Sequence, residues 1–309
     1  MVSKDEFKTF LTNLVSAEEK EKYNKKIVRN TIISICLLLA AIFFAFLMLV
    51  VPGGNASVFI TLSIMSAVGS LIVILSRRIG VSRDLEKKYK NKVLDFIFKD
   101  TKYSYSKHDY ISKRIFTKSQ LARDYEDLEG EDLLVLNIPD DNNNETSTNL
   151  IISDVHATKE VYNNDKDRYE TKTLYKGVLG YVEFPFKFNC RLTINRNEYA
   201  YMENLSKVEL ESIDFNKKFK VRSSDQIEAR YILTTDMMAK LMAIHEREKN
   251  FELVLDENMM FISMPWRNMF SVKVGKTVDG EAFLGFYEDI ALFMDIIKEI
   301  QTNDKIFKM

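Results

Sequence analysis

Two long apolar runs dominate the N-terminal part of the chain. Thr31 to Val51 and Ala56 to Leu75 are 21 and 20 residues long and contain no charged residue. About 20 helical residues, at 1.5 Å each, cross a hydrocarbon core of ~30 Å. The residues between the runs, Pro52-Gly53-Gly54-Asn55, form a turn sequence. The pattern therefore predicts a two-helix transmembrane hairpin over residues 31–75.

The length and pairing of these runs argue against a signal peptide. A signal peptide has a shorter apolar core and is not followed at once by a second run. Small residues at helical spacing, Ser63 with Ala67 and Ser66 with Ser70, predict close contact between the two helices, as do Ala40, Ala41 and Ala45. Neither run contains Asp, Glu, Lys, Arg or His, which favours an anchor over a transport path, although an oligomeric pore stays open.

The basic residues predict the orientation of the hairpin. Lys and Arg gather on both flanks, and the connecting turn contains neither. The flanking residues are Lys20, Lys22, Lys25, Lys26 and Arg29 before the first run, and Arg77, Arg78, Arg83, Lys87, Lys88, Lys90 and Lys92 after the second. Since cytoplasmic flanks carry the excess of Lys and Arg, we expect a cell-membrane protein with two spans and both termini in the cytoplasm.

The segments on either side of the hairpin have helical patterns. Residues 1–30 predict a cytoplasmic amphipathic helix that begins with a capping box of Ser3 and Glu6. Its apolar face rests either on the membrane or a partner, or on the protein's own soluble domain. Residues 76–99 predict a basic juxtamembrane helix. Its candidate lipid-facing residues are Arg77, Arg78, Arg83, Lys87 and Lys88, although topology alone would also explain these charges.

Residues 100–309 alternate between strand and helix patterns. Strands rich in Val, Ile, Thr, Tyr and Phe are predicted at Leu133–Ile138, Leu150–Val161, Thr171–Phe184 and Cys190–Ile194, with an exposed loop over Asp140–Glu145. A helix begins near Thr234 or Thr235, a hairpin turns at Asp256-Glu257-Asn258, Phe270–Val274 adds a strand, and a last helix covers Tyr287–Gln301. The fold class is therefore α+β: an N-terminal transmembrane helical hairpin, followed by one mixed, β-rich cytoplasmic domain with a C-terminal helix.

Charge and cysteine content narrow the function classes. The net charge is −1, but residues 1–83 contain 10 Lys/Arg against 5 Asp/Glu, a net of +5. The remaining 34 Lys/Arg and 40 Asp/Glu give residues 84–309 a net of −6, which argues against nucleic acid as a partner. The two cysteines, Cys36 and Cys190, form no disulfide framework, which fits a reducing compartment.

No motif for catalysis or cofactor binding stands out. His108, His156 and His245 are not spaced as metal ligands, and the sequence has neither a phosphate-binding glycine loop nor a nucleophile elbow. The strand pattern around Cys190 favours a buried thiol over a reactive one. We therefore predict no catalytic residue, metal or cofactor. Whether the protein is an enzyme stays open, and the missing motifs favour a protein without enzyme activity.

The most distinctive segment is Lys207–Leu233. It contains Leu210-Glu211, Phe215-Asn216, Phe219-Lys220-Val221, Asp225 and Glu228-Ala229-Arg230-Tyr231, followed by Leu233-Thr234 and preceded upstream by Tyr175-Lys176-Gly177. With these residues, and with two transmembrane helices ahead of a soluble domain, the chain resembles the bacterial membrane-protein family catalogued as domain of unknown function 3137. The resemblance implies the layout of the parts and no activity.

Four polar residues of this segment form a candidate cluster: Glu211, Asp225, Glu228 and Arg230. In the functional interpretation they line a polar cleft. In the structural interpretation Ser224 or Asp225 caps a helix, Glu228 completes the capping box, and Arg230 pairs with Glu211 or Asp225. Both interpretations stay open from the sequence, with the structural one favoured.

The leading functional hypothesis is a membrane-anchored interaction or scaffold module. Its expected partners are the lipid bilayer and a protein, or a second copy of the chain. The alternatives are a lipid-headgroup or small-ligand sensor at the membrane surface, and a membrane-tethered enzyme with an unrecognised site.

Overall fold

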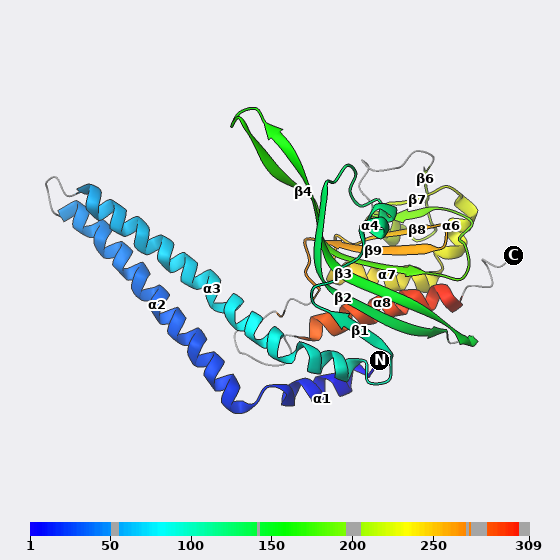
Figure 1. The fold of residues 1–309 in the computed structure, drawn as a ribbon, viewed down its shortest axis with the longest axis horizontal. Helices are drawn as coiled ribbons and strands as arrows, with labels where there is room; N and C mark the ends of the chain where they lie inside the picture. The colour runs from blue at the N-terminus through cyan, green and yellow to red at the C-terminus, as the bar shows by residue number, and fades with distance from the viewer. Residues whose placement is uncertain (51–55, 141–142, 196–204, 270–271, 273–282, 303–309) are drawn as a thin grey trace. The chain divides into compact units, whose positions relative to one another are not determined.

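The computed structural model describes residues 1–50, 56–140, 143–195, 205–269, 272 and 283–302. The chain forms two compact units, residues 1–97 with 270–285 and residues 98–269 with 286–309. Two long apolar helices come first, an antiparallel sheet follows, and the last element is a helix (Figure 1). The predicted α+β fold class is confirmed.

The first unit contains three helices, α1 (Lys4–Leu14), α2 (Ala17–Val50) and α3 (Ala56–Ile97). The capping box predicted at the N-terminus is confirmed, since Ser3 accepts from the Glu6 N–H and the Glu6 carboxylate accepts from the Ser3 N–H at 3.0 Å. Residues 1–30 are not one helix as predicted, because the backbone is extended at Val15 and α2 starts two residues later. From there α2 continues without a break into the first apolar run.

Small polar residues join α2 to α3, which run side by side in opposite directions (Figure 1). The hydroxyls of Ser34 and Ser70 lie 2.9 Å apart, and Ser70 Oγ also donates to the Ser34 carbonyl. Ser63 Oγ donates to the Ala41 carbonyl at 2.9 Å. Contact through small residues, predicted for Ser63, Ser70 and Ala41, is confirmed. Both helices are long and apolar enough to cross a membrane, while the turn predicted at residues 52–55 lies outside the described residues.

The second unit is built on one sheet. Its strands are β1 (Tyr103–Ser106), β2 (Asp127–Asp140), β3 (Asn143–Asn163), β4 (Arg168–Glu183), β5 (Leu192–Ile194), β6 (Ser206–Lys207), β7 (Val221–Ser223), β8 (Glu252–Asp256) and β9 (Met259–Pro265). They lie in the order β1-β2-β3-β4-β9-β8-β5-β7-β6, and each recorded pair is antiparallel. The helices are α4 (Lys113–Ser119), α5 (Ile213–Lys218), α6 (Gln226–Ile232), α7 (Thr235–Arg247) and α8 (Leu284–Thr302).

Most of the predicted elements in this unit are found. The four predicted strands correspond to β2, β3, β4 and β5, and Asp256 pairs with Met259 to close the β8–β9 hairpin. Thr234 caps α7 by accepting from the Met237 N–H at 3.1 Å. The loop predicted over residues 140–145 is shorter, because β3 already begins at Asn143. Apart from Val272, the strand predicted at residues 270–274 lies outside the described residues.

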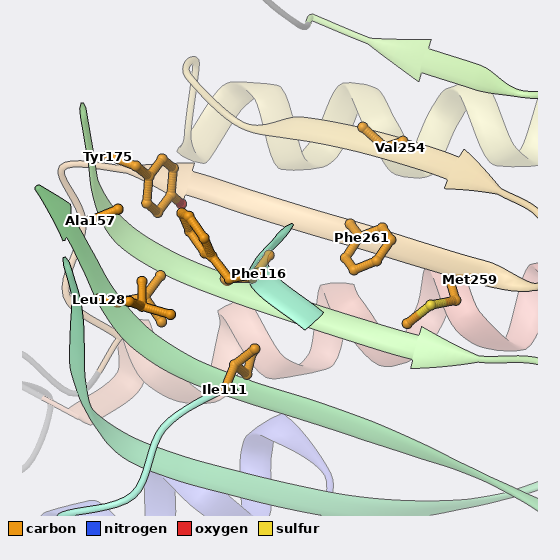
Figure 2. Packing of buried hydrophobic residues seen from close by; sticks show 10 residues of the cluster. Ile111, Phe116, Leu128, Ala157, Tyr175, Val254, Met259 and Phe261 are labelled. Atoms are coloured by element: carbon orange, nitrogen blue, oxygen red, sulfur yellow. The ribbon is translucent and has the colours of Figure 1, made fainter. Parts of the chain in front are cut away.

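Each face of the sheet has its own apolar layer. On one face, Phe116 of α4 packs among Leu128, Tyr175 and Phe261, as Figure 2 shows. On the other face lies α8, where the Phe293 ring is 3.7 Å from the position of a Cβ on Gly180. Lys240 of α7 pairs with Glu299 of α8, so the two helices are joined to each other.

Strands β3 and β4 continue beyond their neighbours as a two-stranded ribbon (Figure 1). The pairing of β2 with β3 stops at Thr158, whereas the pairing of β3 with β4 continues to Asn163 and Arg168. We call residues 159–173 the β3–β4 ribbon.

Candidate functional site

The second unit carries a polar cleft of about 270 Å³ at one end of the sheet. We call it the sheet-end cleft. Its lining residues come from β2, β3, β4 and the segment after β9, and they are Glu129, Gly130, Glu131, Asp154, Val155, His156, Lys176, Gly177, Arg267 and Asn268.

The register of the strands explains why charged side chains gather there. Residues two apart on a strand share a face, and directly paired residues on neighbouring strands are adjacent. Ile152 of β3 is buried opposite Leu134, and the next residues on that face are Asp154, opposite Glu131, and His156, opposite Glu129. Lys176 of β4 is the other neighbour of His156. The same face therefore changes from apolar to charged along β3.

A glycine allows the backbones to meet closely at the floor of the cleft. Gly177 has φ +154°, and a Cβ there would lie 2.2 Å from the Met264 carbonyl oxygen. Beside it β9 ends at Pro265, and Trp266 takes a left-handed φ of 61° while its N–H donates to the Lys176 carbonyl at 2.6 Å. This turn directs the chain away from β4 and places Arg267 at the cleft.

Arg267 is held by acidic residues of α8 and of the position just after α7. Its guanidinium donates to the Asp289 carboxylate and, at 3.1 Å, to Glu248 Oε2. Arg247 donates to the same Asp289 at 2.9 Å and to Glu288. Burial raises the pKa of Asp289, and the two guanidiniums act against that shift by stabilising the charged form. The network therefore fixes one wall of the cleft.

The cleft is lined by charged and hydrogen-bonding side chains of both signs. His156 Nε2 lies 2.9 Å from Thr173 Oγ1, yet in the described part of the chain no third group orients the imidazole as a general base requires. Tyr175, beneath the cleft, donates to the Val178 carbonyl, and burial raises its pKa, so the phenol stays protonated. Among the described residues, no three His, Cys, Asp or Glu side chains are grouped to hold a metal ion.

The predicted polar cluster lies elsewhere, around α6. Asp225 is the N-cap, as predicted, and accepts from the N–H groups of Ile227 and Glu228 at 2.8 and 3.0 Å. Arg230 donates to the carbonyls of Gln226 and Glu209, so its predicted pairing with Glu211 or Asp225 is wrong. Main-chain oxygens are closer to its guanidinium than either carboxylate.

Glu228 does not complete the capping box that the sequence predicts. The Asp225 N–H donates to Ser223 Oγ at 3.1 Å instead, and Glu228 Oε2 is buried without a hydrogen-bond partner among the described residues. Burial raises the pKa of the neighbouring Cys190 thiol, and the negative charges of Glu228 and Asp225 raise it further. Cys190 is therefore buried and protonated, as its strand context predicts. Whether the cluster also binds a ligand stays a prediction.

The predicted lipid-facing residues lie on α3. Arg83 and Lys87 are exposed, while Lys88 forms an ion pair with Glu19 of α2. The side chains of Arg77 and Arg78 lie outside the described residues.

Sequence reasoning did not single out the residues of the sheet-end cleft. Glu129, Glu131, Asp154 and His156 are ordinary charged positions in a strand pattern, and only the register brings them together. The available signals were the Lys176-Gly177 dipeptide of the family resemblance and the single tryptophan of the chain, Trp266.

Comparison with known proteins finds one matching family and one similar solved structure. No curated protein matches the chain. The crystal structure of the mycobacterial trehalose monomycolate transport factor A, TtfA, is similar with 11% identity and a TM-score of 0.35, over 66% of this chain and 92% of that chain. Residues 173–302 match the family described as "Protein of unknown function (DUF3137)", which confirms the resemblance seen in the sequence. The matched residues run from Thr173, beside the sheet-end cleft, to Thr302 at the end of α8, which is less than half of the chain.

Proposed function

We propose that this protein is a membrane-anchored interaction module of the cell membrane. The hairpin of α2 and α3 anchors it, with both termini in the cytoplasm, and the second unit binds an extended segment of a partner polypeptide along the outer edge of β4. The open edge of β4 is the observation that carries the proposal.

The anchor is supported by the side chains that α2 and α3 present to their surroundings. Large apolar residues such as Leu39, Phe46, Met65 and Ile72 are exposed along both helices. A stable protein in water seldom exposes so much apolar surface, whereas a bilayer covers it. Lys and Arg flank both apolar runs, which supports a cytoplasmic position for both ends.

The edge of β4 is open where β9 leaves it. Strand β9 pairs with β4 from Gly177 to Glu183 only. From Arg168 to Tyr175, no described strand lies on that side of β4. The opposite edge of the ribbon differs, because the Glu160 N–H of β3 donates to the Glu126 carboxylate at 3.0 Å. Unpaired strand edges are the surfaces on which extended peptides add a strand.

Exposed aromatic rings lie on the β3–β4 ribbon, close to this edge. Tyr162 and Tyr169 are 44% and 69% exposed and pack against each other at 5.1 Å between ring centroids. Trp266, at the base of the ribbon, is 75% exposed. Tyrosine and tryptophan are enriched among the residues that contribute most to protein–protein binding. Asn163 Oδ1 accepts from two N–H groups of the turn, at 3.0 and 3.3 Å, and these hydrogen bonds close the end of the ribbon.

Affinity capture of the full-length protein after crosslinking in cells tests the proposal. We expect a reproducible polypeptide partner, or a second copy of the chain, that is lost from the Tyr162→Ser/Tyr169→Ser double variant. Tyr231→Ser is the control, because Tyr231 is 52% exposed but lies on α6, away from the ribbon. Equal recovery of the partner with the double variant would contradict the assignment of the edge.

The sheet-end cleft favours a second candidate, a small-ligand sensor. Its carboxylates, imidazole and two cationic side chains offer hydrogen bonds and charge of both signs in about 270 Å³. A small molecule that co-purifies with the wild type and is lost with Lys176→Gln would favour the small-ligand sensor over the interaction module. The membrane-tethered enzyme stays a prediction from the sequence.

A further inference from the structure

A basic cavity of about 450 Å³ lies between α2 and α3 in the first unit. It is lined by Lys22, Tyr23, Lys25, Lys26 and Arg29 of α2 and by Asp84 of α3. Four cations and one carboxylate give the lining a net charge of +3. We propose that this cavity binds the phosphate-bearing headgroup of an anionic membrane lipid.

The cavity has cationic side chains to spare for a phosphate. Lys26 pairs with Asp84 at 3.1 Å, and Lys25 pairs with Glu21 at 2.7 Å. Among the described residues, Lys22 and Arg29 have no carboxylate partner. Arginine can donate two parallel hydrogen bonds to a phosphate, and lysine adds a point charge. A phosphate bound there would therefore balance part of the excess positive charge of the cavity.

The cavity lies at the depth of the headgroups if the hairpin spans the membrane, and in this the inference rests on the proposed function. Arg29 is two residues before Thr31, where the first apolar run begins, which is about 3 Å along the helix axis. Lys22 is nine residues before it, about 14 Å. The headgroup layer on each side of the hydrocarbon core is about 5–8 Å thick. Lys25, Lys26 and Arg29 would thus reach the phosphates of the same leaflet.

An adjoining hollow favours a lipid over a soluble phosphate compound. A hollow of about 700 Å³ along α2 shares Lys25 and Arg29 with the basic cavity. It continues past Val28 to Ile32 and Ile33, which are apolar and exposed. A headgroup on Lys25 and Arg29 would leave its acyl chains beside these residues, where burial of their CH₂ groups is favourable. A soluble phosphate compound would gain nothing from that surface.

Native mass spectrometry of the full-length protein measures this binding. The protein is reconstituted with phosphatidylcholine and phosphatidylglycerol, and the ratio of the two lipids that it retains is recorded. We compare Lys22→Gln/Lys26→Gln/Arg29→Gln with Arg83→Gln/Lys87→Gln/Lys92→Gln, which removes three charges from exposed positions of α3 outside the cavity lining. We expect the cavity variant to lose the preference for phosphatidylglycerol by at least about tenfold, and the control by less than about twofold.

The outcomes separate this inference from the proposed function. If both variants lost the preference for phosphatidylglycerol equally, the lipid would be attracted by charge in general. That result would overturn the assignment of the lipid to this cavity. Glycerol phosphate that binds as tightly as phosphatidylglycerol would show a site for soluble phosphate compounds and overturn the lipid. In either case retention of the protein in the membrane after alkaline carbonate leaves the anchor intact. Release of the wild type by carbonate would overturn the anchor and this inference with it.

Discussion

The two segments that carry the family resemblance use their polar side chains in opposite ways. Around α6, Asp225 and Arg230 are occupied by helix N–H groups and main-chain carbonyls. At Tyr175-Lys176-Gly177, the aromatic ring is buried, the glycine allows two backbones to meet, and the Lys176 side chain stays exposed in a cleft. A dense motif can thus mark what the fold requires, while side chains that remain available for a ligand lie outside it.

Replacement of Gly177 is expected to have the largest effect. A Cβ at Gly177 would lie 2.2 Å from the Met264 oxygen, and the φ of +154° is unfavourable for any other residue. We expect Gly177→Ala to lower the free energy of unfolding by at least about 3 kcal/mol. A urea titration of the full-length protein in detergent, followed by brief proteolysis, measures it.

Gly180→Ala is the matched control on the same strand. A Cβ there would meet Ile152 Cγ1 at 3.5 Å, an ordinary contact, so its unfolding midpoint should stay close to that of the wild type. Similar losses in both variants would show that β4 tolerates no side chain at either glycine and that the close approach at the cleft is not special.

Loss of Asp289 should have the next largest effect. Asp289→Ala leaves Arg247 and Arg267 without the buried carboxylate that joins them. We expect a loss of about 3 kcal/mol in the free energy of unfolding, together with a disordered cleft wall. Asp214→Ala removes an exposed carboxylate paired with Lys217 at 3.8 Å and should change stability by less than about 0.5 kcal/mol. A stable Asp289→Ala variant would refute the role of the network.

Asp225→Ala tests the structural side of the comparison. It removes the N-cap of α6 and should lower the free energy of unfolding by about 1 kcal/mol. Since Glu211 is exposed, Glu211→Gln should leave stability unchanged. If Asp225→Ala abolished partner capture at unchanged stability, the cluster would be a binding site, and the contrast between the two segments would fail.

The smallest expected effect is a dependence on pH. His245 packs against Phe219 of the motif segment, and burial, followed by Lys218 and Lys249, lowers its pKa. Because its pKa is lowered on folding, His245 binds a proton more readily in the unfolded chain than in the folded one. The stability that the neutral imidazole contributes is therefore complete at neutral pH and is lost as the pH falls below about 6.5. Between about pH 7.5 and pH 5.5, His245→Gln should reduce the loss of stability relative to the wild type. Parallel pH profiles would contradict this assignment.

Patterns within short stretches of the sequence predict the helices and strands. The residues of the sheet-end cleft are brought together only by the pairing of the strands. The apolar runs, the Ser3–Glu6 box, the cap at Thr234 and the turn at Asp256-Glu257-Asn258 each depend on residues close in sequence. The sheet-end cleft depends on which residue of β2 faces which residue of β3, and that register is fixed by the whole buried face. A sequence shows which residues are charged, and it therefore favours a carboxylate as the partner of Arg230. It does not show which main-chain carbonyls the guanidinium contacts in the folded chain.

The central claim, that a polypeptide adds to the outer edge of β4, is tested most directly by a photoreactive phenylalanine analogue at Tyr169. The full-length protein carries it in cells, and a second version carries it at Tyr231 of α6. We predict one main adduct from Tyr169, with a peptide of the partner or of a second copy mapped along β4, and none from Tyr231. Adducts of equal yield from both positions, or none from Tyr169, would contradict the claim.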